Sequence, residues 1–566
     1  MAIRARLAAP APVEREAHAS LSPQWSELPM RLLLSGDRRM EAETYLSSGY
    51  GLRLALQERS NGWVPLSQLA RVWQPLRLKG TLLPEGIGTP FLAATQVFDV
   101  RPVPRKWLAI EKTSNASNRF VKPGTIVVTC SGAVGRATLA YDAHADTLIS
   151  HDLLRVEPRS PEQRGWIYAY LRSPQARAMM NSAQYGHIIK HLETSHLDAL
   201  PIPVVRDDIA ADFQRQVELI LELRNRAHQL MLQAEVRFED ALGEFSADEQ
   251  SEPGFEVAAS TLFSGRRRLE ATPHNPVVAK IRKHLVKGGL RLDRLGDAGY
   301  KVWLPGRFKR VPAVEGVWFL DSADIFEVNP DVTKRIADGS FGDEFNGRVK
   351  DGYLLVARSG QTYGINGSVV LASKALEGCV ISDHVLRVSP QHGAKFRAGY
   401  LSVVLGHPKL GQPMVKSLAY GSSIPEIDPS DFSNLQIVRL HPKTENLISE
   451  LAEESAAARS QADILERKIA TDAGILVDKF LAGDSQSFVM TTQRRSTEAT
   501  KAALSALHEH ARVRLLRRIG DQPKGSVGAV VHIYGDAQGL EVEFIKAHGL
   551  PDVLTVNAKD VDLLND

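Results

Sequence analysis

Two stretches in the first half of the sequence gather side chains that could hydrogen-bond to DNA. One is a polar, basic segment before the Phe120 strand, and the other is QYGHIIKHLE at residues 184–193. Donors and acceptors on loops can reach base edges in a groove, while lysine and arginine can contact phosphates. The candidates there are Lys106, Lys112, Ser114, Asn115, Asn118, Arg119, Gln184, Tyr185, His187, Lys190 and His191.

Three stretches in the second half offer a different set of such side chains. KVWLPGRFKR at residues 301–310 interleaves basic with aromatic residues, which suits phosphate and sugar contact. RSGQTYGING at residues 358–367 could address adenine through glutamine or asparagine and guanine through arginine. AYGSSIPEI at residues 419–427 adds tyrosine and serine but no basic residue. The candidates are Lys301, Arg307, Lys309, Arg310, Arg358, Gln361, Thr362, Tyr363, Asn366, Tyr420, Ser422 and Ser423.

Several of these segments also have a purely structural interpretation. Residues 106–119 could form a solvated hairpin loop, and residues 301–310 could form a lysine-rich edge strand. The Ser-Gly pairs Ser131-Gly132 and Ser359-Gly360 are better explained as turn formers than as residues that contact bases.

The length and composition set limits on what the chain can be. Its 566 residues predict two or three domains, because single hydrophobic cores stop growing near ~250–300 residues. A composition of 43% hydrophobic and 24% charged residues excludes disordered and collagenous classes. With two cysteines and neither a signal peptide nor a long apolar run, we expect a cytoplasmic protein without membrane contact. The net charge of +3 does not by itself indicate a nucleic-acid partner.

Motifs for catalysis are missing from the sequence. It has no Asp/Asn-Pro-Pro-Tyr/Phe motif for amino methylation, and GDQPKGS at residues 520–526 places its lysine wrongly for a phosphate-binding loop. The histidines at residues 191 and 196, and those at 508 and 510, miss the HExxH spacing of a zinc site. We therefore expect a protein that is not an enzyme and has no metal or cofactor of its own, and we rank a fused methyltransferase or nuclease below it.

The two halves of the chain repeat one another. FLAATQVFDVRP at residues 91–102 recurs as FLDSADIFEVNP at residues 319–330, and ISHDLLRVEP at residues 149–158 recurs as ISDHVLRVSP at residues 381–390. Three further blocks recur in the same order at a spacing of roughly 230 residues. Five matches in unchanged order indicate a tandem duplication, and the two copies carry different residues in their loops.

Each copy ends in a segment with the apolar spacing of a long helix, at residues 206–243 and 441–482. The first stripe is interrupted by Arg224, and the second runs through Leu451 and Leu476 with Asp472 as its exception. We expect an antiparallel coiled coil that acts as a spacer about 50 Å long; two helices packed separately on their own domains are the alternative. The second copy lacks the prolines of LPIP at residues 200–203, which predicts a less sharply defined helix start.

With these segments in place, the chain resembles the specificity subunit of type I restriction–modification systems. The resemblance covers roughly residues 27–482 and rests on RRMEAETY at residues 38–45, the Pro-Gly to Ser-Gly block at residues 123–132, and the Tyr-Gly to Leu-Pro-Ile-Pro segment at residues 185–203. It implies two target recognition domains that read a bipartite double-stranded DNA sequence. It also implies two adenine methyltransferase subunits that use S-adenosylmethionine and dock on the helices, and a motor-nuclease subunit that could join them in restriction–modification or another phage-defence system.

The expected fold class is α+β: a tandem duplication of a β-rich target recognition domain followed by a long helix, and then a small SH3-like C-terminal β domain. The tail beyond residue 482 lies outside the resemblance and should contain an arginine-rich helix at residues 497–519. A duplicated protein-binding scaffold without DNA specificity is the alternative function. The expected divisions are an N-terminal tail at 1–26, recognition domain 1 at 27–205, spacer helix 1 at 206–243, a linker at 244–258, recognition domain 2 at 259–440, spacer helix 2 at 441–482, a linker and basic helix at 483–520, and a small β-barrel-like domain at 521–566.

Overall fold

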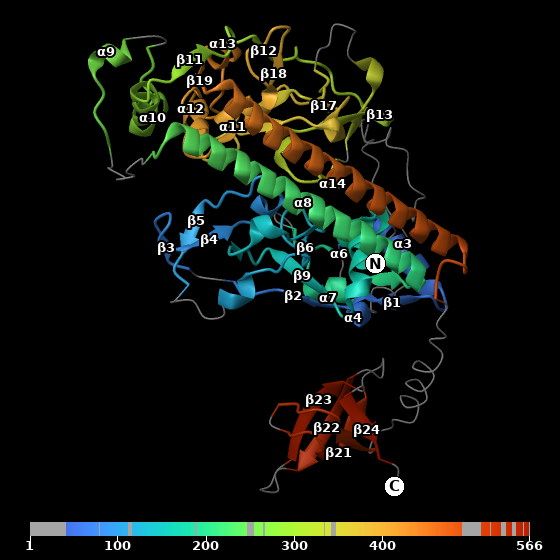
Figure 1. Cartoon of the computed structure of the whole chain (residues 1–566). Coiled ribbons are helices and arrows are strands. Elements are labelled where there is room, and N and C mark those ends of the chain that lie inside the picture. Colours follow the sequence, from blue (N-terminus) through green and yellow to red (C-terminus); the bar gives the residue numbers. More distant parts are fainter. Residues whose placement is uncertain are drawn as a thin grey trace. The chain divides into compact units, whose positions relative to one another are not determined.

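The protein divides into two compact units, one of residues 1–57 and 64–487 and the other of residues 58–63 and 488–566. The first unit contains two β-rich halves and a pair of long helices (Figure 1). The structure is a computed structural model, and it describes residues 41–77, 80–110, 116–186, 190–245, 254–263, 267–332, 334–340, 347–489, 511–520, 522–533, 539–545, 551–557 and 560–564.

Two four-stranded sheets form the first β-rich half. One has the strand order β2-β9-β6-β7 with antiparallel neighbours, and the other has the order β3-β5-β4-β8, in which β4 and β8 run parallel. Strand β1 pairs with β10 in a separate small sheet. The strands are β1 Trp63–Pro65, β2 Ala70–Trp73, β3 Leu82–Leu83, β4 Thr89–Leu92, β5 Lys106–Leu108, β6 Ile126–Thr129, β7 Ala137–Leu139, β8 Leu148–Ile149, β9 Leu153–Pro158 and β10 Pro201–Pro203. The helices are α2 Ala42–Leu46, α3 Ser48–Glu58, α4 Leu66–Leu69, α5 Arg164–Arg172, α6 Pro174–Ala183 and α7 Thr194–Asp198.

The second β-rich half has sheets with a corresponding strand order. Its antiparallel sheet is β12-β18-β15-β16, and its smaller sheet, β14-β13-β17, contains the parallel pair β13 and β17. Strand β11 pairs with β19 as β1 does with β10. The strands are β11 Arg291–Arg294, β12 Tyr300–Trp303, β13 Pro312–Leu320, β14 Arg335–Ile336, β15 Leu354–Ala357, β16 Val369–Leu371, β17 Val380–Ile381, β18 Val385–Pro390 and β19 Gln436–Arg439. The helices are α9 Ala259–Leu262, α10 Pro276–Lys287, α11 Ala398–Gly406, α12 Gly411–Lys416 and α13 Pro429–Ser433.

One fully buried arginine occupies the same place in each half. Arg155 in β9 donates from Nη1 to the carbonyl of Ser150, and Arg387 in β18 donates from Nη1 to that of Ser382, both at 2.9 Å. The Nη2 atom of each also donates to the carbonyl of the preceding isoleucine. Burial lowers the pKa of both guanidinium groups to about 10. Each arginine thus fixes the Ile-Ser turn of the recurring ISHDLLRVEP and ISDHVLRVSP blocks.

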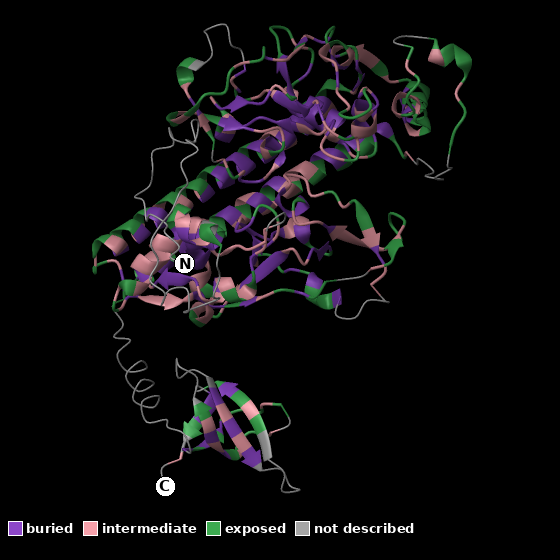
Figure 2. Cartoon of the chain, turned by 180° about the vertical axis from the view of Figure 1, so that it is seen from behind, coloured by how far each residue is buried: buried purple, intermediate pink, exposed green. Residues whose placement is uncertain are grey.

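The two long helices lie side by side between the β-rich halves (Figure 1). Helix α8 spans Asp207–Leu242 and helix α14 spans Pro442–Ala482. They run antiparallel, because Gln216 accepts from Lys468 at 3.3 Å whereas the carbonyl of Ala227 accepts from the earlier residue Ser455 at 2.6 Å. Buried and exposed residues alternate along both helices (Figure 2), as expected where one side of each helix carries an apolar stripe.

Backbone contacts between the β-rich halves place them about a pseudo-two-fold axis. The amide of Val100 donates to the carbonyl of Phe326 at 2.7 Å, and the amide of Val328 donates to that of Phe98 at 2.6 Å. These bonds bring Asp99 opposite its repeat counterpart Glu327. The facing helix residues Ala227 and Ser455 have the same spacing along the chain as Asp99 and Glu327, so one axis relates both contacts.

Arg224 interrupts the stripe of α8 because it forms a buried ion-pair network. Its Nη2 lies 3.3 Å from Oδ1 of Asp463 and also contacts Oε2 of Glu466, both on α14. The hydroxyl of Tyr168 on α5 donates to the other oxygen of Glu466. The charges of Arg224 and Arg172 hold the pKa of Glu466 below its ordinary value despite its burial. The other exception, Asp472, pairs near the surface with Lys468.

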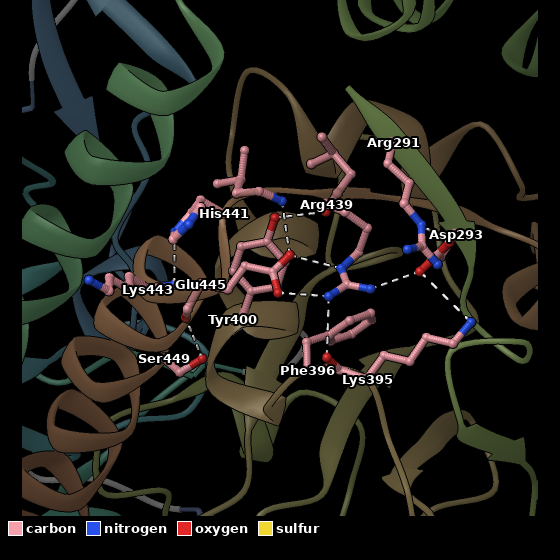
Figure 3. A network of polar contacts seen from close by, with 12 residues as sticks. Arg291, Asp293, Lys395, Phe396, Tyr400, Arg439, His441, Lys443, Glu445 and Ser449 are labelled. Atoms are coloured by element: carbon pink, nitrogen blue, oxygen red, sulfur yellow. Dashed lines mark hydrogen bonds and ion pairs between the residues drawn. The ribbon is translucent and has the colours of Figure 1, made fainter. Parts of the chain in front are cut away.

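Helix α14 begins at Pro442, so a proline stands at its first position although this copy lacks the prolines of LPIP. A network around Arg439, the last residue of β19, fixes this start (Figure 3). The guanidinium donates to both carboxylate oxygens of Glu445 at 2.8 and 2.9 Å and to Asp293 at 2.8 Å. The imidazole of His441 also accepts from the amide of Lys443 at 3.3 Å. These side-chain hydrogen bonds and Pro442 together define the start of the helix.

The second unit contains a five-stranded antiparallel sheet. Its order is β23-β22-β21-β20-β24, and its core includes Val513, Leu540 and Phe544. The helix expected at residues 497–519 is wrong in its described part, because residues 512–515 form strand β20 with Arg512 and Arg514 exposed and the alternate residues buried. The C-terminal β domain therefore begins before residue 521. The strands are β20 Arg512–Leu515, β21 Val527–Ile533, β22 Gly539–Ile545, β23 Pro551–Asn557 and β24 Val561–Leu563.

Candidate nucleic-acid interface

A short hairpin is fastened to a Ser-Gly turn in the first half. Tyr185 and His191 exchange backbone hydrogen bonds of 2.9 and 2.7 Å. The amide of Gly132 donates to the carbonyl of Lys190 at 3.2 Å, and Oγ of Ser131 lies 3.1 Å from Nδ1 of His191. This hairpin is the segment that the sequence singled out at residues 184–193, although His187 lies outside the described residues.

The second half contains the same arrangement of a hairpin fastened to a Ser-Gly turn, and we call each of the two arrangements a frame. Tyr420 and Glu426 exchange backbone hydrogen bonds of 2.9 and 2.8 Å, and the amide of Gly360 donates to the carbonyl of Pro425 at 3.1 Å. The hydroxyl of Ser359 donates to Oε1 of Glu426 at 3.1 Å. In both hairpins a glycine follows the paired tyrosine, and this glycine has φ of 99° in one half and 107° in the other, a conformation that favours glycine.

The two frames carry different chemistry at equivalent positions. Where the first hairpin has His191, the second has Glu426, whose carboxylate also pairs with Arg358. In the second frame, Nδ1 of His384 lies 3.0 Å from Oγ of Ser359. Sequence reasoning missed Glu426 and His384, although aligning the repeats would have placed Glu426 opposite His191. The same backbone scaffold therefore presents a basic and polar set in one half and an acidic and paired set in the other.

The loop candidates of the first half separate into exposed and buried residues. Lys106 on β5 and Asn118 are exposed, so both can reach a ligand. Arg119 is 2% exposed, and its guanidinium donates to the carbonyl of Leu76. We therefore withdraw Arg119 as a DNA contact, because its donors are turned into the protein. Lys112, Ser114 and Asn115 lie outside the described residues.

Of the basic candidates at residues 301–310, Lys301 lies on β12, the outer strand of its sheet, and the other three lie on the loop between β12 and β13. The edge-strand alternative is therefore wrong for residues 304–311, since no strand is assigned there. Arg307 is almost fully exposed and Lys309 is also exposed. Arg310 is less free, because it pairs with Asp383 at 2.9 Å and lies over the ring of Phe319 at 4.8 Å. The loop offers two exposed cations and one anchored one.

The glycine-rich loop at residues 358–367 contributes fewer contacts than expected. Asn366 is fully buried, and its amide donates to the carbonyls of Arg358 and Pro425 at 3.0 and 2.9 Å. It holds the hairpin to the turn and cannot address adenine. Gln361 donates to the carbonyl of Ser423 at 2.7 Å, which ties this loop to the hairpin tip. On the same loop, Tyr363 is exposed and Thr362 is half-buried. On the neighbouring hairpin, Tyr420 is half-buried, and Ser422 and Ser423 are exposed.

The structure therefore belongs to a class of molecules in which two similar polar frames are joined through one antiparallel helix pair. In the part of the chain that the structure describes, no group of three or more histidine, cysteine, aspartate or glutamate side chains is placed to hold a metal ion. No described helix has the length and apolarity needed to cross a bilayer.

Comparison with solved structures gives 22 matching chains, among them the following two. The S subunit of a type I restriction-modification system from M. genitalium aligns with 77% of this chain and 98% of its own at 13% identity and a TM-score of 0.26. The HsdS subunit from Thermoanaerobacter tengcongensis aligns with 75% of this chain and 98% of its own at 14% identity and a TM-score of 0.22. At scores this low the alignments carry no weight beside the geometry. No protein-family model matches the sequence. No curated protein matches it either.

Proposed function

We propose that this chain is a non-catalytic DNA-specificity subunit that reads a bipartite double-stranded target. One observation carries the proposal: the same hairpin-on-turn frame occurs twice about a pseudo-two-fold axis and carries different side chains in its two copies. A duplicated frame with different donors and acceptors suits two unlike half-sites at a fixed separation. We infer that the halves arose by tandem duplication and that the helix pair acts as the spacer.

The helix pair also suits protein partners. Helix α8 exposes Leu219, Leu232 and Val236, and α14 exposes Ile464 and Ile475. Apolar side chains on the outer faces of long helices are suited to bury against other chains. By resemblance to the type I specificity subunits, we propose two adenine methyltransferase subunits that bind S-adenosylmethionine as the partners. We also propose that a motor-nuclease subunit can join the complex and that the complex acts in phage defence. For the C-terminal sheet we propose an SH3-like barrel, which would dock a partner or cap one end of the helix pair.

Co-expression with partner methyltransferase subunits should place methyl groups on adenines within a two-part motif of fixed internal spacing. The physical reason is that the helix pair sets the separation of the two frames. Mapping of modified adenines across the host genome measures this directly. Scattered or absent methylation would contradict the proposal, and a chain without salt-dependent DNA binding would be better explained as a protein-binding scaffold.

The double substitution Lys190→Ala and His191→Ala should weaken binding to the first half-site about tenfold to a hundredfold, because the loss of one base contact costs roughly 1–3 kcal/mol. Binding to DNA that carries only the second half-site should stay unchanged. Gel-shift titrations on duplexes with one half-site altered at a time separate the two effects. Equal losses on both half-sites would show that the hairpin does not read sequence.

The matched control is the double substitution Arg307→Ala and Lys309→Ala on the exposed loop between β12 and β13. Cations of this kind contact phosphates, so affinity should fall for every sequence alike. The slope of log affinity against log salt should become shallower by about two. A loss restricted to one sequence would instead assign base contacts to this loop.

A further inference from the structure

A cavity of about 390 Å³ lies where the two β-rich halves meet the helix pair. Its wall takes residues 99–105 from the first half, residues 363–371 from the second, and residues from both α8 and α14. None of the hairpin residues 185–191 or 420–426 lines it. The cavity is therefore separate from the two hairpins, although Tyr363 of the glycine-rich loop lies in its wall, and it reaches both halves at once.

Cationic side chains outnumber carboxylates in this wall. The cations are Arg101, Arg105, Arg224, Lys416 and Arg459, and the carboxylates are Asp99 and Glu235. Arg101 is neutralised by Glu235 at 2.5 Å, and Arg224 by Asp463 and Glu466. The excess positive charge therefore resides on Arg105, Lys416 and Arg459, with Asp99 as the one carboxylate of the wall that has no ion pair among the described residues.

Arg459 and Lys416 have donors to spare. Arg459 is 8% exposed and donates from Nη2 to the carbonyl of Leu371 at 2.7 Å, and neither it nor Lys416 has a carboxylate within ion-pair distance among the described residues. Burial and the charge of Arg105 lower the pKa of Lys416, so cations from opposite halves repel one another across the cavity. Nε and Nη1 of Arg224 are also buried with no described partner. An anion placed there would relieve the repulsion and accept these hydrogen bonds.

The rest of the wall is apolar and fits an organic group. It includes Val100, Val103, Met231, Ile365 and Val370, with Tyr141 and Tyr363 as aromatic members. A cavity of this size lies within the range of small-molecule sites, which typically combine apolar walls with a few placed charges. The planar guanidinium groups match the oxygens of a phosphate.

We propose that this cavity binds a small organic phosphate of nucleotide size, whose phosphate contacts Arg459 and Lys416 and whose apolar body packs against residues 100–103 and 365–370. Such a ligand touches both β-rich halves and both helices, so it holds the two frames at one separation. It binds without DNA and without partner subunits, which keeps the proposal independent of the function assigned to the hairpins.

Isothermal titration of the full-length chain with AMP tests the site, with adenosine and inorganic phosphate as companion probes. AMP should bind at one molecule per chain and raise Tm, because ligands that bind only the folded state stabilise it. Adenosine should bind at least about tenfold more weakly, because it lacks the charge that the cations attract. Absence of binding by AMP and phosphate at millimolar concentration would overturn the proposal.

Substitutions locate the binding site. Arg459→Gln and Lys416→Gln should each weaken AMP binding at least about tenfold. Lys416 has no described ion pair to lose, so Lys416→Gln keeps the test decisive if the Arg459 variant fails to fold. Arg467→Gln is the matched control, because Arg467 lies on α14 outside the cavity and donates to the carbonyl of Ala375 at 3.1 Å. Equal affinities in the wild type, Arg459→Gln and Lys416→Gln would place AMP elsewhere and refute the site.

Discussion

Replacing Arg224 with methionine is expected to lower the free energy of unfolding by about 3–5 kcal/mol, because removing one member of a buried ion pair leaves the other charge uncompensated. Arg224 is 2% exposed and contacts Asp463 and Glu466, which are themselves buried. Methionine keeps much of the volume but cannot neutralise either carboxylate. Urea unfolding followed by tryptophan fluorescence measures the change.

Two controls separate the buried charge from the substitution itself. Arg226→Met removes an exposed cation two residues away, whose pair with Glu454 at 3.6 Å is open to solvent, and should cost less than about 1 kcal/mol. The triple change Arg224→Met, Asp463→Leu and Glu466→Met removes all three charges and should recover most of the loss. If the triple variant is as unstable as the single one, packing rather than charge explains the effect.

The long helices were predictable because their information is local. The apolar spacing placed them at residues 206–243 and 441–482, and the structure has them at Asp207–Leu242 and Pro442–Ala482. The inward-facing residues of the second helix were predicted less accurately. Ala452 and Val477 are buried, whereas the spacing favoured Leu451 and Leu476. Helix α14 packs against α5 and α11 as well as α8, so its buried face is wider than one stripe.

Some candidate residues form hydrogen bonds to distant segments of the chain, and the sequence alone could not reveal these contacts. Arg119 and Asn366 have the composition of base-reading residues, yet both are turned inward toward backbone carbonyls. The acceptors of Asn366 include Pro425, which is far away in the chain, so no local pattern signals this contact. The Arg-rich segment before residue 519 was predicted as a helix, but residues 512–515 form a strand. Its buried residues Val513 and Leu515 alternate with exposed arginines, which is the period of a strand.

Replacing Asp99 with asparagine is expected to remove a pH dependence of stability worth about 4 kcal/mol. Burial raises the pKa of Asp99 to about 7, well above its ordinary value near 4. Between these two values the folded protein keeps a proton that the unfolded chain releases. The free energy of unfolding therefore falls as pH rises from about 4 to 7 and loses nothing further from this group above that range.

The asparagine variant resembles the protonated carboxyl at every pH, so it should match the wild type near pH 4 and exceed its stability by about 4 kcal/mol at pH 8. Asp212→Asn is the control, because that carboxylate is exposed on α8 and pairs with Arg215 at 2.8 Å. Comparing variant with wild type at each pH cancels the titration of every other group. A constant difference across the range would mean that Asp99 is already ionised in the folded protein. Arg105, the cation that lowers the pKa of Asp99 against its burial, would then be the group that stabilises the ionised carboxylate.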